Sequence, residues 1–116
     1  MTKYGNIKTK IDGYTFDSKA EANRYRELRI LEMAHEITTL EVHPKYVLQD
    51  AFEYHGRKLQ PITYEADFSY YEFTEGGKYV VEDVKGGRAT QTALFKVKAK
   101  MFKKKFPDLE FRIVEG

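Results

Sequence analysis

Three residues of this chain combine the types and spacing that metal-assisted hydrolysis needs. Asp83 and Lys85 lie two positions apart in the apolar segment Tyr79–Lys85, and side chains two apart in a β-strand point the same way. Asp67 lies upstream in a segment rich in aromatic residues. A hairpin between the two segments would bring Asp67 near Asp83, but sequence alone leaves the strand register open.

Two carboxylates that meet on a sheet repel each other unless a cation lies between them. Mg²⁺ prefers oxygen ligands and is commonly held by one or two carboxylates together with substrate phosphates. A lysine beside them can orient a water or stabilise charge in the transition state. These groups therefore suit phosphodiester hydrolysis with Mg²⁺ or Mn²⁺. The alternative is a surface ion pair of Lys85 with Asp67 or Asp83, which such common triplets often form.

Charge along the chain changes sign at this point. Between Glu65 and Asp83 the chain has one basic residue, Lys78, and six acids: Glu65, Asp67, Glu72, Glu75, Glu82 and Asp83. Residues 85–105 are basic and contain no acid. An acidic pocket next to a basic face suits an enzyme that acts on a polyanion. The candidate phosphate contacts are Arg88, Lys96, Lys98, Lys100 and Lys103. The alternative is a solvated helix face; the stripe of Leu94, Val97 and Met101 on that helix is expected to be core.

Local patterns predict the elements that hold these residues. Ser18 and Glu21 have the spacing of a capping box, and apolar residues recur at helical spacing from Ala22 as far as Ile37. Short strands are expected at 37–41 and 46–49, with His43-Pro44 as a turn between them.

Residues 62–73 alternate with a period of two and predict one long strand. Its alternation would put Ile62, Tyr64, Ala66, Phe68 and Tyr70 on one face. A turn at 74–77 and a returning strand at 79–85 complete a hairpin. Thr90 or Thr92 would cap a second helix that ends near Phe106, before Pro107, and 109–114 would be a last strand. This order predicts a sheet of the α/β or α+β class with a helix on each face.

The composition sets the frame for this interpretation. At 116 residues the chain fits a single domain, 1–116, and without cysteine any metal must be held by oxygen or imidazole. The N-terminus has no apolar signal-peptide region, and no stretch is long enough to span a membrane, so we expect a cytoplasmic protein with no membrane partner. Residues 1–12 are polar and basic and are expected to form a flexible arm.

Two segments resemble a known nuclease motif. Tyr64-Glu-Ala-Asp-Phe68 and Val81-Glu-Asp-Val-Lys-Gly86 are similar to the two halves of the PD-(D/E)XK motif. Residues 3–6 and 16–25 also match a family of short phage- and prophage-encoded proteins assigned to that superfamily. With these segments, the resemblance covers nearly the whole chain. Two departures are Ala66 in place of proline and Asp83 in place of glutamate. Glu82 is a rival ligand, but alternation points it away from Lys85.

The resemblance implies a fold, a site and an activity. The fold would be α/β, with a restriction-endonuclease-like core in the order helix, three strands, helix, strand. Asp67 and Asp83 would bind Mg²⁺ or Mn²⁺, Lys85 would position the nucleophile, and Glu21 would be a further ligand unless it only caps its helix.

The implied activity is a metal-dependent DNA endonuclease, acting as a homodimer in the host cytoplasm if the protein is phage-encoded. Branched DNA is a natural substrate, because RecU-like and archaeal Holliday junction resolvases are similar small members. The alternative is a non-catalytic nucleic-acid-binding or phage-assembly module that retains the fold.

Overall fold

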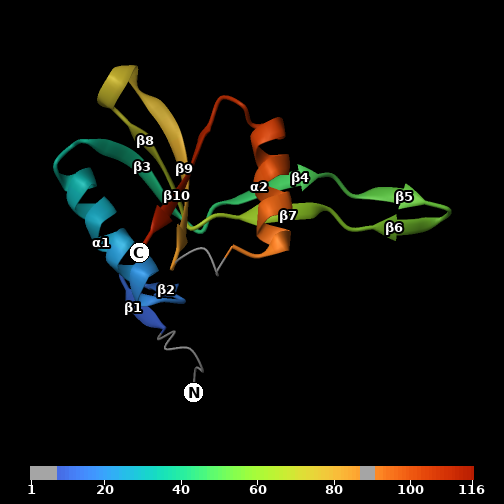
Figure 1. The fold of residues 1–116 in the computed structure, drawn as a ribbon, viewed down its shortest axis with the longest axis horizontal. Helices are drawn as coiled ribbons and strands as arrows, with labels where there is room; N and C mark the ends of the chain where they lie inside the picture. Colours follow the sequence, from blue (N-terminus) through green and yellow to red (C-terminus); the bar gives the residue numbers. More distant parts are fainter. Residues whose placement is uncertain (1–7, 87–90) are drawn as a thin grey trace.

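The computed structural model describes residues 8–86 and 91–116, and a mixed sheet lies at their centre (Figure 1). Its strand order is β10-β9-β8-β3. Strands β3 (Ile37–Val42), β8 (Phe68–Glu72) and β9 (Lys78–Lys85) are antiparallel neighbours, whereas β10 (Glu110–Glu115) runs parallel to β9. A parallel pair needs a crossover, and helix α2 (Ala93–Lys105) lies between β9 and β10 in the chain.

Two helices cover opposite faces of this sheet. The neighbouring residues Val80 and Val81 show this arrangement, since Val80 packs in a core with Tyr25 and Leu28 of α1 (Lys19–Met33), while Val81 packs in a second core with Phe102 of α2. Successive side chains of a strand point to opposite faces, so the two cores lie on either side of β9. The predicted mixed α/β architecture is confirmed.

Helix α1 begins as predicted but ends earlier. The Ser18 hydroxyl accepts a hydrogen bond from the Glu21 backbone N–H at 3.2 Å, which is the capping interaction expected from the sequence. The helix was expected to run to Ile37, but it stops at Met33, and His35 follows with a φ of 61°. Ile37 is instead the first residue of β3, and its apolar side chain is buried in the core between the sheet and α1.

The predicted long strand at 62–73 is divided in two. Strand β7 (Ile62–Glu65) leaves the central sheet and pairs with β4 (Lys45–Gln49), and β8 resumes at Phe68. The single apolar face was therefore a wrong prediction. Tyr64 and Ala66 pack in the α2 core, whereas Phe68 and Tyr70 pack in the α1 core.

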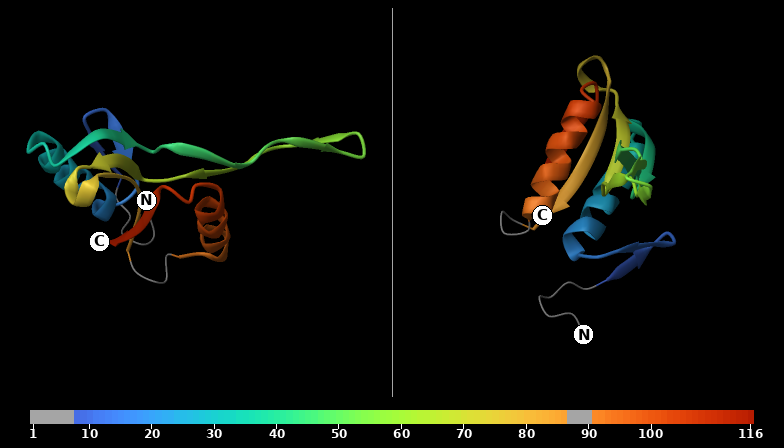
Figure 2. Two further views of the ribbon diagram at one scale, coloured as in Figure 1. Left: turned by 90° about the horizontal axis from the view of Figure 1, so that it is seen from above. Right: turned by 90° about the vertical axis from the view of Figure 1, so that its right-hand side faces the viewer.

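A long two-stranded ribbon, residues 45–65, extends from the sheet away from the body of the molecule (Figures 1 and 2). Beyond β4 and β7 it continues as β5 (Phe52–Tyr54) and β6 (Arg57–Leu59), joined by a turn in which His55 and Gly56 have φ of 49° and 77°. All residues from 50 to 61 are exposed. The outer half of the ribbon was not predicted.

Residues 9–16 form a hairpin, so the expectation of a flexible arm over residues 1–12 is wrong for residues 9–11. Strands β1 (Thr9–Ile11) and β2 (Tyr14–Phe16) pair across Asp12 and Gly13, whose φ values are 52° and 86°. Positive φ at both central residues is the geometry of the tight turns that hairpins favour. Residues 1–7 lie outside the described part of the chain. No helix among the described residues is long and apolar enough to cross a membrane.

Helix α2 has the predicted ends but a different buried face. The Thr92 hydroxyl accepts from the Phe95 backbone N–H at 3.1 Å, and Phe106 terminates the helix before Pro107; Thr90 lies outside the described residues. Of the stripe expected in the core, Leu94 and Val97 are 63% and 55% exposed and only Met101 packs against it. The buried residues are Phe95, Ala99 and Phe102, because the bulkier aromatic face turns toward the sheet.

Candidate active site

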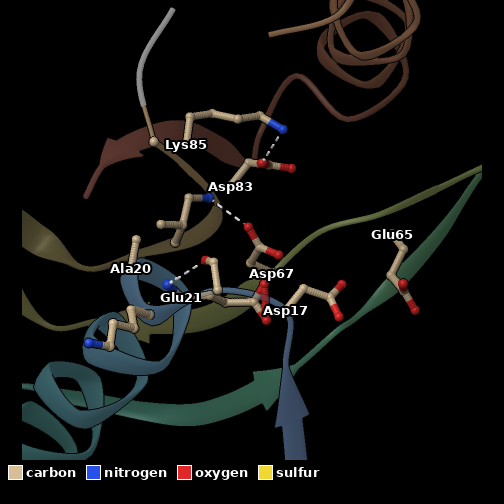
Figure 3. A pocket seen from close by; sticks show the side chains of 11 residues that line it. Asp17, Ala20, Glu21, Glu65, Asp67, Asp83 and Lys85 are labelled. Carbon is tan, nitrogen blue, oxygen red and sulfur yellow. Dashed lines mark hydrogen bonds and ion pairs between the residues drawn. The ribbon is translucent and has the colours of Figure 1, made fainter. Parts of the chain in front are cut away.

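A cleft of about 500 Å³ opens where the start of α1, the break between β7 and β8, and the end of β9 come together (Figure 3). All four residues predicted for the site line it: Glu21, Asp67, Asp83 and Lys85. The remaining lining residues are Asp17, Ser18, Lys19, Ala20, Glu65, Val84 and Gly86. The structure therefore brings together acids from three separate segments of the chain.

The hairpin register places Asp67 beside Asp83. Phe68 pairs with Glu82, and the Asp67 backbone N–H donates to the Glu82 carbonyl at 3.0 Å. The Asp67 carboxylate in turn accepts from the Val84 backbone N–H at 2.6 Å. Asp67 thus lies at the point where the strand breaks, with its carboxylate oriented by the partner strand.

Asp83 and Lys85 act as a pair on the α2 side of β9. The Lys85 ammonium lies 2.9 Å from Asp83 Oδ1, and the Tyr64 hydroxyl donates to Asp83 Oδ2 at 2.5 Å. Lys85 Nζ also lies 3.9 Å from the centre of the Phe95 ring, in the first turn of α2. These contacts fix both side chains in one orientation, as the spacing of two predicted.

Glu21 combines a place in the helix cap with a place in the site. Its backbone N–H binds Ser18, but its carboxylate turns into the cleft, where Oε1 lies 3.0 Å from His43 Nε2. The side chain is buried on the face of α1 that looks toward the sheet. The capping role and the site role are therefore compatible, since different atoms of the residue serve them.

His43 is a member of this cluster that the sequence did not predict. Donor atoms of Glu21, His43 and Asp67 all lie within 4.8 Å of one another. His43 follows β3 with a φ of 56°, and its backbone N–H donates to the Asp67 backbone carbonyl at 2.9 Å. An isolated histidine before a proline carries no periodic signal, so only the path of β3 past α1 places it here. The Tyr64 hydroxyl was missed too, although its burial follows from the strand alternation.

The electrostatics of the cleft disfavour a negative charge on Asp67. Burial, together with the nearby charges of Asp83 and Glu21, raises the pKa of Asp67 to about 8, against the lowering effect of its hydrogen bond from Val84. Burial and the hydrogen bond to Asp83 raise the pKa of Tyr64 far above its usual range, which keeps the phenol protonated as a donor. A cation in the cleft would relieve the repulsion that the carboxylates impose on one another.

The donor set matches hard divalent ions. The carboxylates of Glu21, Asp67 and Asp83 line the cleft, and carboxylate oxygens are ligands that Mg²⁺ and Mn²⁺ prefer. The donor atoms of Glu21, His43 and Asp67 lie close enough together to hold one ion, whereas the oxygens of Asp83 bond to Lys85 and Tyr64. The imidazole of His43 suits Mn²⁺ better than Mg²⁺ if it binds directly. While it is bonded to Glu21, it can instead orient that carboxylate from behind.

Glu82 is directed away from the cleft, as strand alternation predicted. It is fully buried on the α1 side of β9 and accepts two hydrogen bonds from the Arg24 guanidinium, at 2.8 and 2.6 Å, and one from Tyr70. Arg24 lies one helical turn after Glu21. This buried ion pair therefore joins α1 to β9 next to the cleft and holds Glu21 in place relative to Asp83.

Comparison with known proteins gives a family but no activity. A family model described as "Protein of unknown function (DUF1064)" matches residues 1–115. The chain belongs to the DUF1064 family. Neither a search of curated proteins nor a search of solved structures finds a match.

The basic residues of this DUF1064 chain fall into separate groups. Lys96, Lys100 and Lys103 line one hollow between α2 and β10. Lys98, two positions from Lys96 and from Lys100, lies on a different side of the helix because successive residues turn by about 100°. Arg88 lies outside the described residues. The row of three lysines begins at Lys96, directly after Phe95, the residue whose ring Lys85 contacts.

Proposed function

We propose that this protein is a divalent-cation-dependent DNA endonuclease of the PD-(D/E)XK superfamily. The observation that carries the proposal is the meeting of Asp67 with Asp83, Lys85 and Glu21 in one open cleft. The order α1, β3, β8, β9, α2, β10 supports it, since it is the helix, three strands, helix, strand order of a restriction-endonuclease-like core.

Each side chain has a role that its position permits. Asp67 and Asp83 would hold the cation, Glu21 would add a third carboxylate, and His43 would orient Glu21 or contribute its own nitrogen. When bound, Mg²⁺ or Mn²⁺ lowers the pKa of a coordinated water and neutralises phosphate charge. Lys85 donates from its fixed position to the attacking water or to a phosphate oxygen, where it stabilises the negative charge of the transition state.

The reaction is hydrolysis. A water oxygen forms a bond to phosphorus, the bond from phosphorus to one ester oxygen breaks, and the water's protons pass to solvent and to the departing oxygen. DNA is the favoured polyanion, because a row of lysines lies next to the cleft and phosphate contacts of this kind bind without regard to sequence. Branched DNA is the first substrate to test.

The test uses purified protein with supercoiled plasmid and a synthetic four-way junction, in Mg²⁺, Mn²⁺ or EDTA. We expect cleavage that EDTA abolishes and that Asp83→Asn and Lys85→Ala each reduce by at least about a hundredfold. Asp108→Asn, on an exposed turn away from the cleft, is the matched control and should keep wild-type activity.

Two results would contradict the proposal. One is the absence of metal-dependent cleavage of any DNA form by folded wild-type protein. The other is cleavage that Asp83→Asn leaves unchanged. Binding of DNA without cleavage would instead support a non-catalytic nucleic-acid-binding module.

A further inference from the structure

The outer half of the ribbon carries an unpartnered apolar face. In the β5–β6 register Phe52 pairs with Leu59 and Tyr54 with Arg57, which puts these side chains on one face, while Glu53 and Lys58 take the other. Phe52, Tyr54 and Leu59 are 44%, 60% and 41% exposed. An isolated two-stranded hairpin is only marginally stable in water. A partner that covers this apolar face would stabilise it.

A second apolar surface lies at the base of the ribbon. A groove of about 510 Å³ runs between β4 and the outer side of α2, lined by Leu48, Val97, Met101 and the stems of Lys100, Lys104 and Lys105. Leu94 continues the exposed apolar stripe along the helix. The Lys105 ammonium donates to the Val47 carbonyl at 2.7 Å, which ties the end of α2 to the ribbon.

The chain exposes more surface than a compact monomer of its mass would. The chain exposes 8195 Å², whereas a compact monomer of 13.6 kDa exposes roughly 6,600 Å². The Cα radius of gyration is 16.0 Å, against about 13 Å for a compact domain of this length. An excess of roughly 1,600 Å² per chain exceeds the ~800 Å² that each partner buries in a standard interface.

Charge distinguishes between the kinds of partner. The ribbon has three basic residues, Lys45, Arg57 and Lys58, and three acids, Asp50, Glu53 and Glu65, so it carries no net charge. A nucleic-acid-binding ribbon would be expected to be basic. A ribbon without net charge that exposes Phe52, Tyr54 and Leu59 fits a protein partner better than a nucleic acid.

We propose that the ribbon is a dimerisation element and that its partner is a second copy of this chain. The apolar face of Phe52, Tyr54 and Leu59 packs into the partner's groove beside Val97 and Met101. A two-fold axis makes the contact reciprocal, so that one chain's ribbon and groove are both covered. The dimer requires neither cation nor DNA, so its test is independent of the proposed nuclease activity.

Light scattering during gel filtration of the full chain, in EDTA and without DNA, measures the mass directly. We expect twice the 13.6 kDa of one chain at micromolar concentrations. Phe52→Ser with Tyr54→Ser, and separately Val97→Glu, should each reduce the mass to that of one chain. Ile30→Glu changes an exposed apolar residue of α1. Because α1 lies on the opposite side of the molecule from β5 and β6 (Figure 1), this variant is the matched control and should leave the dimer intact.

A variant with Asn-Gly in place of residues 50–61 removes the outer ribbon while keeping the β4–β7 pairing of Gln49 with Ile62, and it should also be monomeric. Circular dichroism checks that each variant remains folded. Because the chain has no cysteine, a mixture of Tyr54→Cys and Val97→Cys proteins should form an interchain disulfide on oxidation. A mixture of Tyr54→Cys with Ile30→Cys should not.

A wild-type mass of one chain at high concentration would overturn the proposal. A dimer that survives both the ribbon and the groove substitutions would also overturn it, since the interface would then lie elsewhere. Ribbon variants that keep the wild-type mass but weaken binding to a DNA duplex would show that the ribbon binds nucleic acid instead.

Discussion

Replacing Asp67 with asparagine changes how the stability of the metal-free protein depends on pH. Burial and the charges of Asp83 and Glu21 raise the pKa of Asp67 from 3.8 to about 8 in the folded state. Below pH 4 both the folded and unfolded states hold the proton. Between pH 4 and 8 only the folded state holds it, so the free energy of unfolding falls as pH rises. Above pH 8 the loss is complete.

The size of the effect follows from the separation of the two pKa values. Each pH unit in this window costs up to about 1.4 kcal/mol, which gives an upper limit of about 6 kcal/mol. Part of the Asp67 side chain remains accessible to water, and screening by solvent reduces such a cost, so we expect about 2–3 kcal/mol. At roughly 4 °C per kcal/mol for a chain of this length, Tm should change by about 10 °C.

The assay is thermal unfolding by circular dichroism in EDTA, from pH 4 to pH 9. Between these limits the Tm of the wild type should fall by about 10 °C more than that of Asp67→Asn. Asp108→Asn, an exposed control, should follow the wild-type curve. Glu21, His43 and Asp83 are present in all three proteins, so the comparison measures the charge of Asp67 together with its coupling to these neighbours.

Divalent cation extends the same test. Mg²⁺ or Mn²⁺ should stabilise the wild type more at pH 9 than at pH 5, because binding favours the ionised carboxylate, and should have little effect on Asp67→Asn. Parallel Tm curves for the wild type and Asp67→Asn would refute the electrostatic account of the cleft.

Two further predictions concern the surroundings of the site. Arg24→Met leaves the buried Glu82 carboxylate without its ion pair and should cost about 3 kcal/mol in urea unfolding. Adding Glu82→Leu should recover much of that loss, and Arg26→Met, on the exposed side of α1, should change stability by less than about 0.5 kcal/mol; equal losses in the two arginine variants would contradict the assigned role. If α2 contacts phosphates, Lys103→Ala should reduce the slope of log K against log salt for DNA binding by about 0.9. Lys58→Ala on the ribbon should leave that slope unchanged, and the reverse result would place DNA on the ribbon.

Features that depend on a few neighbouring residues could be predicted from the sequence. The Ser18–Glu21 cap, the Thr92 cap and the end of α2 before Pro107 all formed as expected. Asp83 and Lys85 meet because residues two apart in a strand share a face. The missed hairpins at Asp12-Gly13 and His55-Gly56 also belong to this local class, since glycine as the second residue of a two-residue turn is a hairpin signal.

The buried face of α2 could not be predicted from the local sequence pattern. Leu94 with Val97, and Phe95 with Phe102, both recur at helical spacing, so each pair could form the core. Only the position of the sheet selects one of them. Phe95 and Phe102 pack against Tyr64 and Phe111, and the other pair remains exposed.

By itself, the sequence determined the chemical types in the cleft and the pairing of Asp83 with Lys85. The tertiary structure decided that Asp67 lies at a strand break, and that Glu21 and His43 reach it from other elements. The break arises because β7 turns away from the central sheet to pair with β4. This pairing depends on residues distant in the sequence, so it cannot be predicted from residues 62–73 alone. Proximity between distant segments depends on how the whole sheet and its helices pack, and periodicity within one segment carries no information about it.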